Sequence, residues 1–147
     1  MHWLAKAFVN YAAFVGRATR REFWSFALLF AVVTGGARFI DSRDGEIVPV
    51  AAGMGVLELT AFIALLLPFV SGSVRRLHDT GRSGWWLLFL YAPYLGFVVA
   101  GPNLIAQAAA SAALLVGAIM LLVLLAMAGE QGANRYGDDP RGEIRPA

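Results

Sequence analysis

One uncharged stretch, from Trp85 to Met127, constrains the fold of this chain more than any other feature. It contains no Asp, Glu, Lys or Arg. Water-exposed helices carry charges on their outer faces, so this stretch predicts helices that are surrounded by lipid. As one continuous helix it would be about 65 Å long, which is twice the thickness of the hydrocarbon core, and it must therefore reverse direction once.

The strongest turn signal inside this stretch is Gly101-Pro102-Asn103. It divides the stretch into predicted spans at residues 85–100 and 104–127. The first of these is short and contains Pro93 and Gly96. A re-entrant hairpin is therefore an alternative to a full span, and it would place the C-terminal tail on the other side of the membrane.

Two further apolar runs, at residues 23–40 and 57–74, predict two more spans. Pro68 removes a helix hydrogen bond and is expected to kink the second of them. Arg38 and Glu58 lie toward the outer ends of these spans, at similar heights, where either charge alone would be unfavourable. We predict a structural ion pair between them, and a functional carboxylate at Glu58 is the alternative.

The fold class predicted is all-α: a polytopic membrane bundle of about four transmembrane helices, forming a single membrane domain over residues 1–147. Apolar residues at helical spacing between Trp3 and Val15 add an N-terminal interfacial amphipathic helix. A disordered lead-in is the alternative for that segment. Because this lead-in is long and partly polar, we expect the first span to be an uncleaved anchor and not a signal peptide.

The basic residues predict the orientation. The chain has 12 Lys and Arg, and all except Arg38 and Arg43 fall on the side of the two termini. By the positive-inside rule, this predicts a multi-pass protein of the bacterial inner (plasma) membrane with both its N-terminus and its C-terminus in the cytoplasm. The segment 130–147, rich in Gly, Pro and mixed charge, is expected to be an extended cytoplasmic tail.

Composition excludes several classes of site. The chain has no Cys and two His, so it lacks the ligands for a disulfide framework, a thiolate site or a histidine-built zinc site. Two adjacent carboxylates, Asp138 and Asp139, make a poor metal site by themselves, and we predict no metal and no cofactor. The net charge is +2, yet the arginines flank apolar runs and form no basic face, so nucleic acid is not an expected partner.

Three polar clusters lie on the predicted cytoplasmic side. They read Gly16-Arg17-Ala18-Thr19-Arg20-Arg21-Glu22-Phe23-Trp24, Arg75-Arg76-Leu77-His78-Asp79-Thr80-Gly81-Arg82-Ser83-Gly84-Trp85-Trp86, and Asn134-Arg135-Tyr136-Gly137-Asp138-Asp139-Pro140. In their residues and in their order along the chain, these clusters resemble the domain of unknown function 805 family, the YhaH-like bacterial inner-membrane proteins. Thr19 departs mildly, since the family often has Ser there. The resemblance implies a small multi-span inner-membrane protein and brings no established activity.

The clusters allow a structural and a functional interpretation. In the structural one, the glycines form a turn, Ser83 caps a helix that begins at Trp85, and His78 and Asp79 lock two helix ends together. If the second helix continues past Val74, Arg75 faces His78 and Asp79, and Asp79 then orients His78 or pairs with an arginine. Asp138 and Asp139 are further partners for the cytoplasmic arginines and would fold the tail back.

In the functional interpretation, the clusters surround an anionic group, such as a lipid phosphate or an acidic segment of a partner. The candidate residues are Arg17, Arg20, Arg21, Arg75, Arg76, His78, Asp79, Arg82, Asn134, Arg135, Asp138 and Asp139. This predicts a non-enzymatic membrane protein with an arginine-rich cytoplasmic face that binds anionic lipid headgroups or a protein partner. The predicted partners are membrane lipids and a membrane protein or a second copy of the chain.

Two other functions remain as alternatives. A small transporter or channel subunit would need polar residues along its path, and the mid-span candidates are Thr34, Thr60, Gln107 and Ser111, with Glu58 at one edge. A membrane enzyme would use His78 as general base with Asp79 orienting it.

A stripe of small residues, Ala109, Ala113 and Gly117, permits close approach of another helix. That helix belongs either to the same bundle or to a second copy of the chain.

Overall fold

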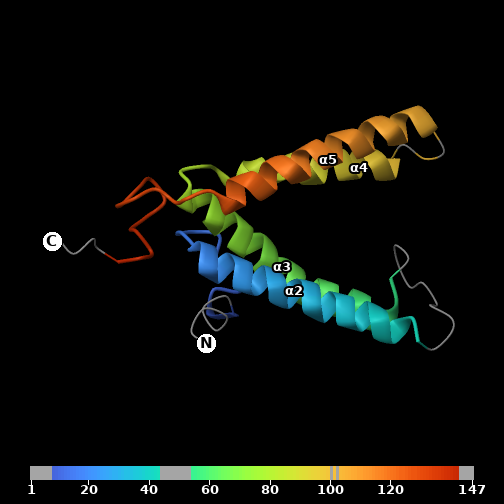
Figure 1. Ribbon diagram of the computed structural model, residues 1–147, viewed down its shortest axis with the longest axis horizontal. Coiled ribbons are helices and arrows are strands. Elements are labelled where there is room, and N and C mark those ends of the chain that lie inside the picture. Colours follow the sequence, from blue (N-terminus) through green and yellow to red (C-terminus); the bar gives the residue numbers. More distant parts are fainter. Residues whose placement is uncertain (1–7, 44–53, 100, 102, 143–147) are drawn as a thin grey trace. The chain divides into compact units, whose positions relative to one another are not determined.

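The computed structural model describes residues 8–43, 54–99, 101 and 103–142. The helices with described bounds are α2 (Arg20–Asp41), α3 (Val56–Asp79), the 3₁₀ helix η1 (Gly84–Leu87), α4 (Leu88–Val99) and α5 (Leu104–Ala126) (Figure 1). Helices α2, α3 and α5 are long and apolar enough to cross a membrane. The all-helical class is confirmed, with three helices of membrane-spanning length.

The helix boundaries differ from the predicted ones where polar residues continue a helix. Helix α3 runs on to Asp79 and does not stop at Val74, so the first residues of the middle cluster are helical. Helix α4 has 12 residues. At about 1.5 Å per residue it is shorter than the hydrocarbon core of about 30 Å, and a fourth complete span stays a prediction.

The predicted interfacial helix is wrong in its C-terminal part, and its first residues lie outside the described part of the chain. Phe8 and Val9 are helical, and a turn follows from Asn10. The turn is stabilised by tertiary contacts. The Ser71 hydroxyl of α3 donates to the carbonyl oxygen of Tyr11 at 3.1 Å, and the Tyr11 hydroxyl donates to the Ala64 carbonyl oxygen. A helix that continued through Tyr11 would orient the carbonyl oxygen and the hydroxyl of this residue differently. The two bonds therefore favour the turn over a longer amphipathic helix.

The chain divides into two compact units, residues 1–14 with 21–73 and residues 15–20 with 74–147. In the first unit α2 packs on α3 through aromatic rings: Phe30 stacks on Phe69 with centroids 4.8 Å apart and meets Phe62 edge-on at 5.9 Å. The single membrane domain that the sequence predicts stays a prediction.

Charged side chains join the far ends of α2 and α3. Arg38 Nη1 lies 3.0 Å from Glu58 Oε2, which is the ion pair that the sequence predicts. The carboxylate of Asp41 accepts hydrogen bonds from the backbone N–H groups of Leu57 (3.3 Å) and Glu58 (2.9 Å). It therefore satisfies donors that the first turn of α3 leaves without helical partners.

In the second unit α4 and α5 form a hairpin, and the chain reverses at the predicted turn (Figure 1). Gly101 adopts a φ of +54°, which is favourable for glycine. Asn103 caps α5, because its side-chain oxygen accepts from the N–H groups of Ile105 and Ala106 at 3.1 Å each. The predicted reversal is thus confirmed.

A proline and a glycine bring the two helices of this hairpin close together. Pro93 has no N–H group with which to bond the carbonyl oxygen of Phe89, four residues earlier. Gly117 of α5 faces that oxygen, and a Cβ atom at Gly117 would lie 2.0 Å from it. The glycine hydrogen in this direction points at the carbonyl, as in a Cα–H···O contact. Of the small-residue stripe, Gly117 therefore packs within the hairpin, whereas Ala109 and Ala113 are exposed.

Candidate functional site

The three polar clusters of the sequence meet in the second unit. The backbone N–H of Ala18, before α2, donates to the carbonyl oxygen of Arg75 at 3.0 Å. The backbone N–H of Glu130, in the tail after α5, donates to the carbonyl oxygen of Asp79 at 2.8 Å. The last turn of α3 thus contacts both the segment before α2 and the tail.

At the centre of this meeting point is a buried group of three charged side chains, Arg17, Arg76 and Asp79, which we call the arginine lock. Arg17 approaches Asp79 Oδ1 with Nε (3.0 Å) and Nη2 (2.9 Å), and Arg76 Nη1 binds Asp79 Oδ2. The exposed fractions of these side chains are 1%, 0% and 3%. Buried charges are stable only with opposite charges and further hydrogen bonds, and one carboxylate serves both guanidinium groups here.

The remaining guanidinium donors of the lock bind backbone carbonyls. Arg17 donates to the carbonyl oxygens of Glu130 and Gly132 in the tail and, at 3.4 Å, to that of Gly137. Arg76 donates to the carbonyl oxygens of Leu125 (2.9 Å) and Met127. The last carbonyls of a helix have no helical partners and carry its negative dipole, so Arg76 stabilises the C-terminus of α5.

Glycine is required where the tail passes over the lock. A Cβ atom at Gly129 would lie 1.9 Å from Asp79 Oδ2. Across the same contact, Gly81 has a φ of +70°, and a Cβ there would lie 2.1 Å from Glu130 Oε1. The close approach of the tail to Asp79 therefore depends on Gly129, whereas glycine is favoured at position 81 by the positive φ, because the end of the Glu130 side chain can move aside.

Outside the lock, the rings of His78 and Tyr136 stack with centroids 3.9 Å apart and an interplanar angle of 3°. His78 Nδ1 lies 3.1 Å from the carbonyl oxygen of Gly16. The Asn134 amide donates to the carbonyl oxygen of His78 at 3.0 Å, and Arg135 Nη2 donates to that of Gly81 at 2.9 Å. These contacts attach the third cluster to the second.

Several predicted pairings differ in the structure. Asp79 binds two arginines and does not orient His78, so the His78–Asp79 pair that an enzyme would need is not formed. The predicted alternative, that Asp79 pairs with an arginine, is confirmed: its partner within α3 is Arg76, and the neighbouring Arg75 is also buried. Ser83 caps η1, because its hydroxyl oxygen accepts from the N–H of Trp85 at 3.3 Å, and this prediction is confirmed.

The tail folds back, but the predicted carboxylates do not attach it. Asp139 Oδ1 accepts from Arg141 Nε (2.9 Å) and from the Arg141 backbone N–H (3.0 Å), and its other oxygen accepts from the Gly132 N–H (3.2 Å). The bonds from Arg141 hold the pKa of Asp139 below its usual range. Asp138 is exposed. Asp139 therefore shapes a turn within the tail.

Sequence reasoning missed Gly129, Tyr136 and Arg141 as members of this site. A glycine directly after a span and an aromatic residue inside a polar tail were the available signals. The other predicted arginines lie at its edge: Arg20, Arg21 and Arg135 are exposed and Arg82 is half-buried. In the described part of the chain, no group of three or more His, Asp or Glu side chains is placed to hold a metal ion.

Known proteins resemble the chain over nearly its whole length. Inner membrane protein YhaI of Escherichia coli (strain K12) is 33% identical over 141 residues, covering 96% of this chain and 97% of its own length. Inner membrane protein YhaH of the same strain is also 33% identical over 141 residues, with 96% and 98% covered. Uncharacterized protein YiiR of that strain is 33% identical over 136 residues, with 86% and 85% covered. No solved structure matches.

The profile of the family described as "Protein of unknown function (DUF805)" matches residues 11–138. That range contains the arginine lock and the tail segment that it binds. Two of these relatives are named as inner membrane proteins, and three helices here are of membrane-spanning length, so the prediction of a transmembrane protein from an uncharacterised inner-membrane family is confirmed. The chain belongs to the DUF805 family.

Proposed function

We propose that this chain is a multi-pass, non-enzymatic inner-membrane protein whose cytoplasmic face binds anionic lipid headgroups through arginines outside the arginine lock. The observation that carries the proposal is the division of the arginines into two sets. Arg17 and Arg76 are buried and bound to Asp79 and to backbone carbonyls. Arg82 and Arg135 lie outside the lock: Arg135 binds the carbonyl oxygen of Gly81, the neighbour of Arg82 in the chain, and Arg82 binds that of Thr80.

The contacts of the lock also support a topology. The residues before α2, the end of α3 and the tail after α5 contact one another, and we therefore assign them to the same membrane face. Helices α2 and α3 together then leave and return to this face, and the α4–α5 hairpin does the same. We propose an even number of crossings, with both termini on the cytoplasmic side where the basic residues gather.

Single-cysteine labelling tests this topology, since the sequence contains no cysteine. Val15, Ser42 and Ala133 are exposed and lie before α2, after α2 and in the tail. In intact spheroplasts we expect a membrane-impermeant maleimide to label Ser42→Cys and to leave Val15→Cys and Ala133→Cys unlabelled until the cells are lysed. Labelling of Ala133→Cys in intact spheroplasts would contradict the proposal and support a re-entrant α4.

The Arg82–Arg135 pair suits a phosphate group. Each guanidinium has five N–H donors. Among the described residues, Arg82 binds one protein oxygen (Nη1 to the Thr80 carbonyl, 3.3 Å) and Arg135 binds one, while the Arg135 guanidinium also lies over the Tyr136 ring, 4.7 Å from its centroid. Planar guanidinium groups bind phosphate oxygens in a bidentate manner. Trp85 follows in η1 and is 73% exposed, as expected for an aromatic residue at headgroup depth.

Lipid selectivity tests the binding. The protein in nanodiscs of mixed phosphatidylglycerol and phosphatidylcholine is expected to retain phosphatidylglycerol preferentially in native mass spectrometry. The double variant Arg82→Gln/Arg135→Gln should lose about 2 kcal/mol of this preference, or about thirty-fold in relative affinity, at roughly 1 kcal/mol per basic residue.

Arg43→Gln is the matched control, because Arg43 is exposed but lies beyond the other end of α2. It should leave the preference unchanged. An unchanged preference in the double variant would contradict headgroup binding. Loss of a captured acidic protein in the double variant, with unchanged lipid preference, would instead support a protein partner.

The contacts of the other candidate residues do not favour the alternatives. Thr34 and Thr60 donate their hydroxyls to the carbonyls of Phe30 and Val56 in their own helices, at 2.7 Å each, and Glu58 pairs with Arg38. These groups are satisfied within the protein, whereas a transport path would present them to a substrate.

A further inference from the structure

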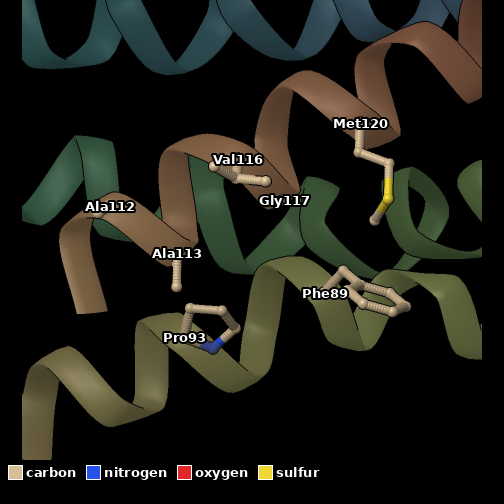
Figure 2. Close-up of a pocket in the computed structure, with 7 residues that line it drawn as sticks. All are labelled: Phe89, Pro93, Ala112, Ala113, Val116, Gly117 and Met120. Carbon is tan, nitrogen blue, oxygen red and sulfur yellow. The ribbon is translucent and has the colours of Figure 1, made fainter. Parts of the chain in front are cut away.

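The hairpin of α4 and α5 carries an apolar groove of about 420 Å³. Figure 2 shows the lining residues of both helices, with Ala113 of α5 pointing toward Pro93 of α4. The full lining is Phe89, Pro93, Ala112, Ala113, Val116, Gly117 and Met120. None of these side chains is charged or donates a hydrogen bond, and the volume falls within the range of about 300–1,000 Å³ that is typical of small-molecule sites.

We propose that this groove holds one acyl chain of an anionic phospholipid whose phosphate is bound by Arg82 and Arg135. This inference rests on the proposed function and adds a second half to the same site. The ligand is then defined by both its negatively charged headgroup and its acyl chain. The proposed function involves the headgroup alone.

The spacing along the chain supports a shared ligand. Arg82 directly precedes Ser83 and η1, and Phe89 of the groove is the second residue of α4. The rise from Gly84 to Phe89 is about 9 Å, using the dimensions of 3₁₀ and α-helices. The headgroup region adds about 5–8 Å to each side of the hydrocarbon core. A phosphate at Arg82 therefore places the start of its acyl chains near Phe89.

Charge complementarity favours a lipid over a second copy of the chain. The two arginines bind the carbonyl oxygens of Thr80 and Gly81, in the turn that precedes η1 and the end of α4 at which Phe89 lines the groove. Close packing of a second helix needs a stripe of small residues. Gly117 of this stripe already packs within the hairpin, where it faces the Phe89 carbonyl, and the larger side chains of Val116 and Phe89, which are 66% and 51% exposed, flank the groove.

Photocrosslinking tests the proposal in the full-length protein. A phosphatidylglycerol probe with a diazirine in the middle of one acyl chain is incorporated into nanodiscs, irradiated, and its adducts are mapped by mass spectrometry. We expect adducts to concentrate on Phe89, Val116 and Met120, and to be several-fold fewer with a phosphatidylcholine probe of the same chain. Arg82→Gln/Arg135→Gln should reduce the phosphatidylglycerol adducts to the phosphatidylcholine level.

A groove-filling variant isolates the acyl-chain half of the site. Ala112→Leu adds volume at a lining position and should lower groove adducts several-fold, whereas Ala108→Leu, one turn earlier, exposed and outside the lining, should not. Headgroup preference in native mass spectrometry should persist in Ala112→Leu, because Arg82 and Arg135 are intact.

Each outcome decides the proposal. Adducts spread evenly over α4 and α5, with a normal preference for phosphatidylglycerol, would overturn the groove assignment and leave the proposed function standing. Groove adducts that are equal for both probes would overturn the anionic lipid and the proposed function together. Absence of groove adducts with both probes would overturn the acyl chain as the occupant. The map of lipid adducts on the wild-type protein tests the proposal even if Ala112→Leu does not fold.

Discussion

Replacement of Asp79 by Asn is expected to lower the free energy of unfolding by about 3–5 kcal/mol, the range measured when one partner of a buried ion pair is removed. Asp79 is the carboxylate of the arginine lock, and its side chain is 3% exposed. Without its charge, Arg17 and Arg76 remain buried side by side with only carbonyl oxygens as partners. Their mutual repulsion is then uncompensated, and the tail is the segment that must move to admit water.

Unfolding in mixed micelles titrated with sodium dodecyl sulfate measures this loss. Asp138→Asn is the matched control, since Asp138 is an exposed carboxylate in the tail and should change stability by less than about 0.5 kcal/mol. Hydrogen exchange adds a local readout: in Asp79→Asn the amides from Gly129 to Gly137 should lose protection before the rest of the chain. A loss below about 1 kcal/mol with a protected tail would contradict the role of the lock.

The second large effect is expected from Gly117→Ala. Its new Cβ atom would lie 2.0 Å from the carbonyl oxygen of Phe89, a backbone atom that no side-chain rotation can move. The α4–α5 hairpin must then separate locally, and overpacking of this kind costs about 1–3 kcal/mol. The helix propensity of alanine, about 1 kcal/mol better than glycine, offsets this cost, and because the clash is with backbone we expect a net loss toward the upper end of about 0–2 kcal/mol.

Gly96→Ala provides the comparison within the same hairpin. A Cβ atom at Gly96 would have its nearest neighbour, the Ala110 Cβ, at 4.0 Å, so the gain in helix propensity should appear undiminished. The two variants should therefore shift the unfolding midpoint in opposite directions in the same micelle titration. Stabilisation of both would show that Gly117 does not determine the approach of α4 and α5.

Features that depend on neighbouring residues could be predicted from the sequence. The uncharged stretch 85–127 required a reversal at its one strong turn signal. Asn103 and Ser83 cap the helices that follow them, because Asn and Ser side chains accept hydrogen bonds from N–H groups of the next few residues. The ion pair of Arg38 with Glu58 could also be predicted, because two spans of similar length bring their outer ends to the same height. These predictions use length, polarity and short-range geometry alone.

The acceptors of the arginine lock could not be predicted, because they are backbone carbonyls. Every residue carries a carbonyl oxygen, so no residue type marks Glu130, Gly132 or Leu125 as a partner of Arg17 or Arg76. From the sequence we predicted that arginines, the carboxylate of Asp79 and a polar tail occupy one membrane face. Only the tertiary structure decided which two arginines bind Asp79, since that depends on how closely Gly129 lets the tail approach this carboxylate.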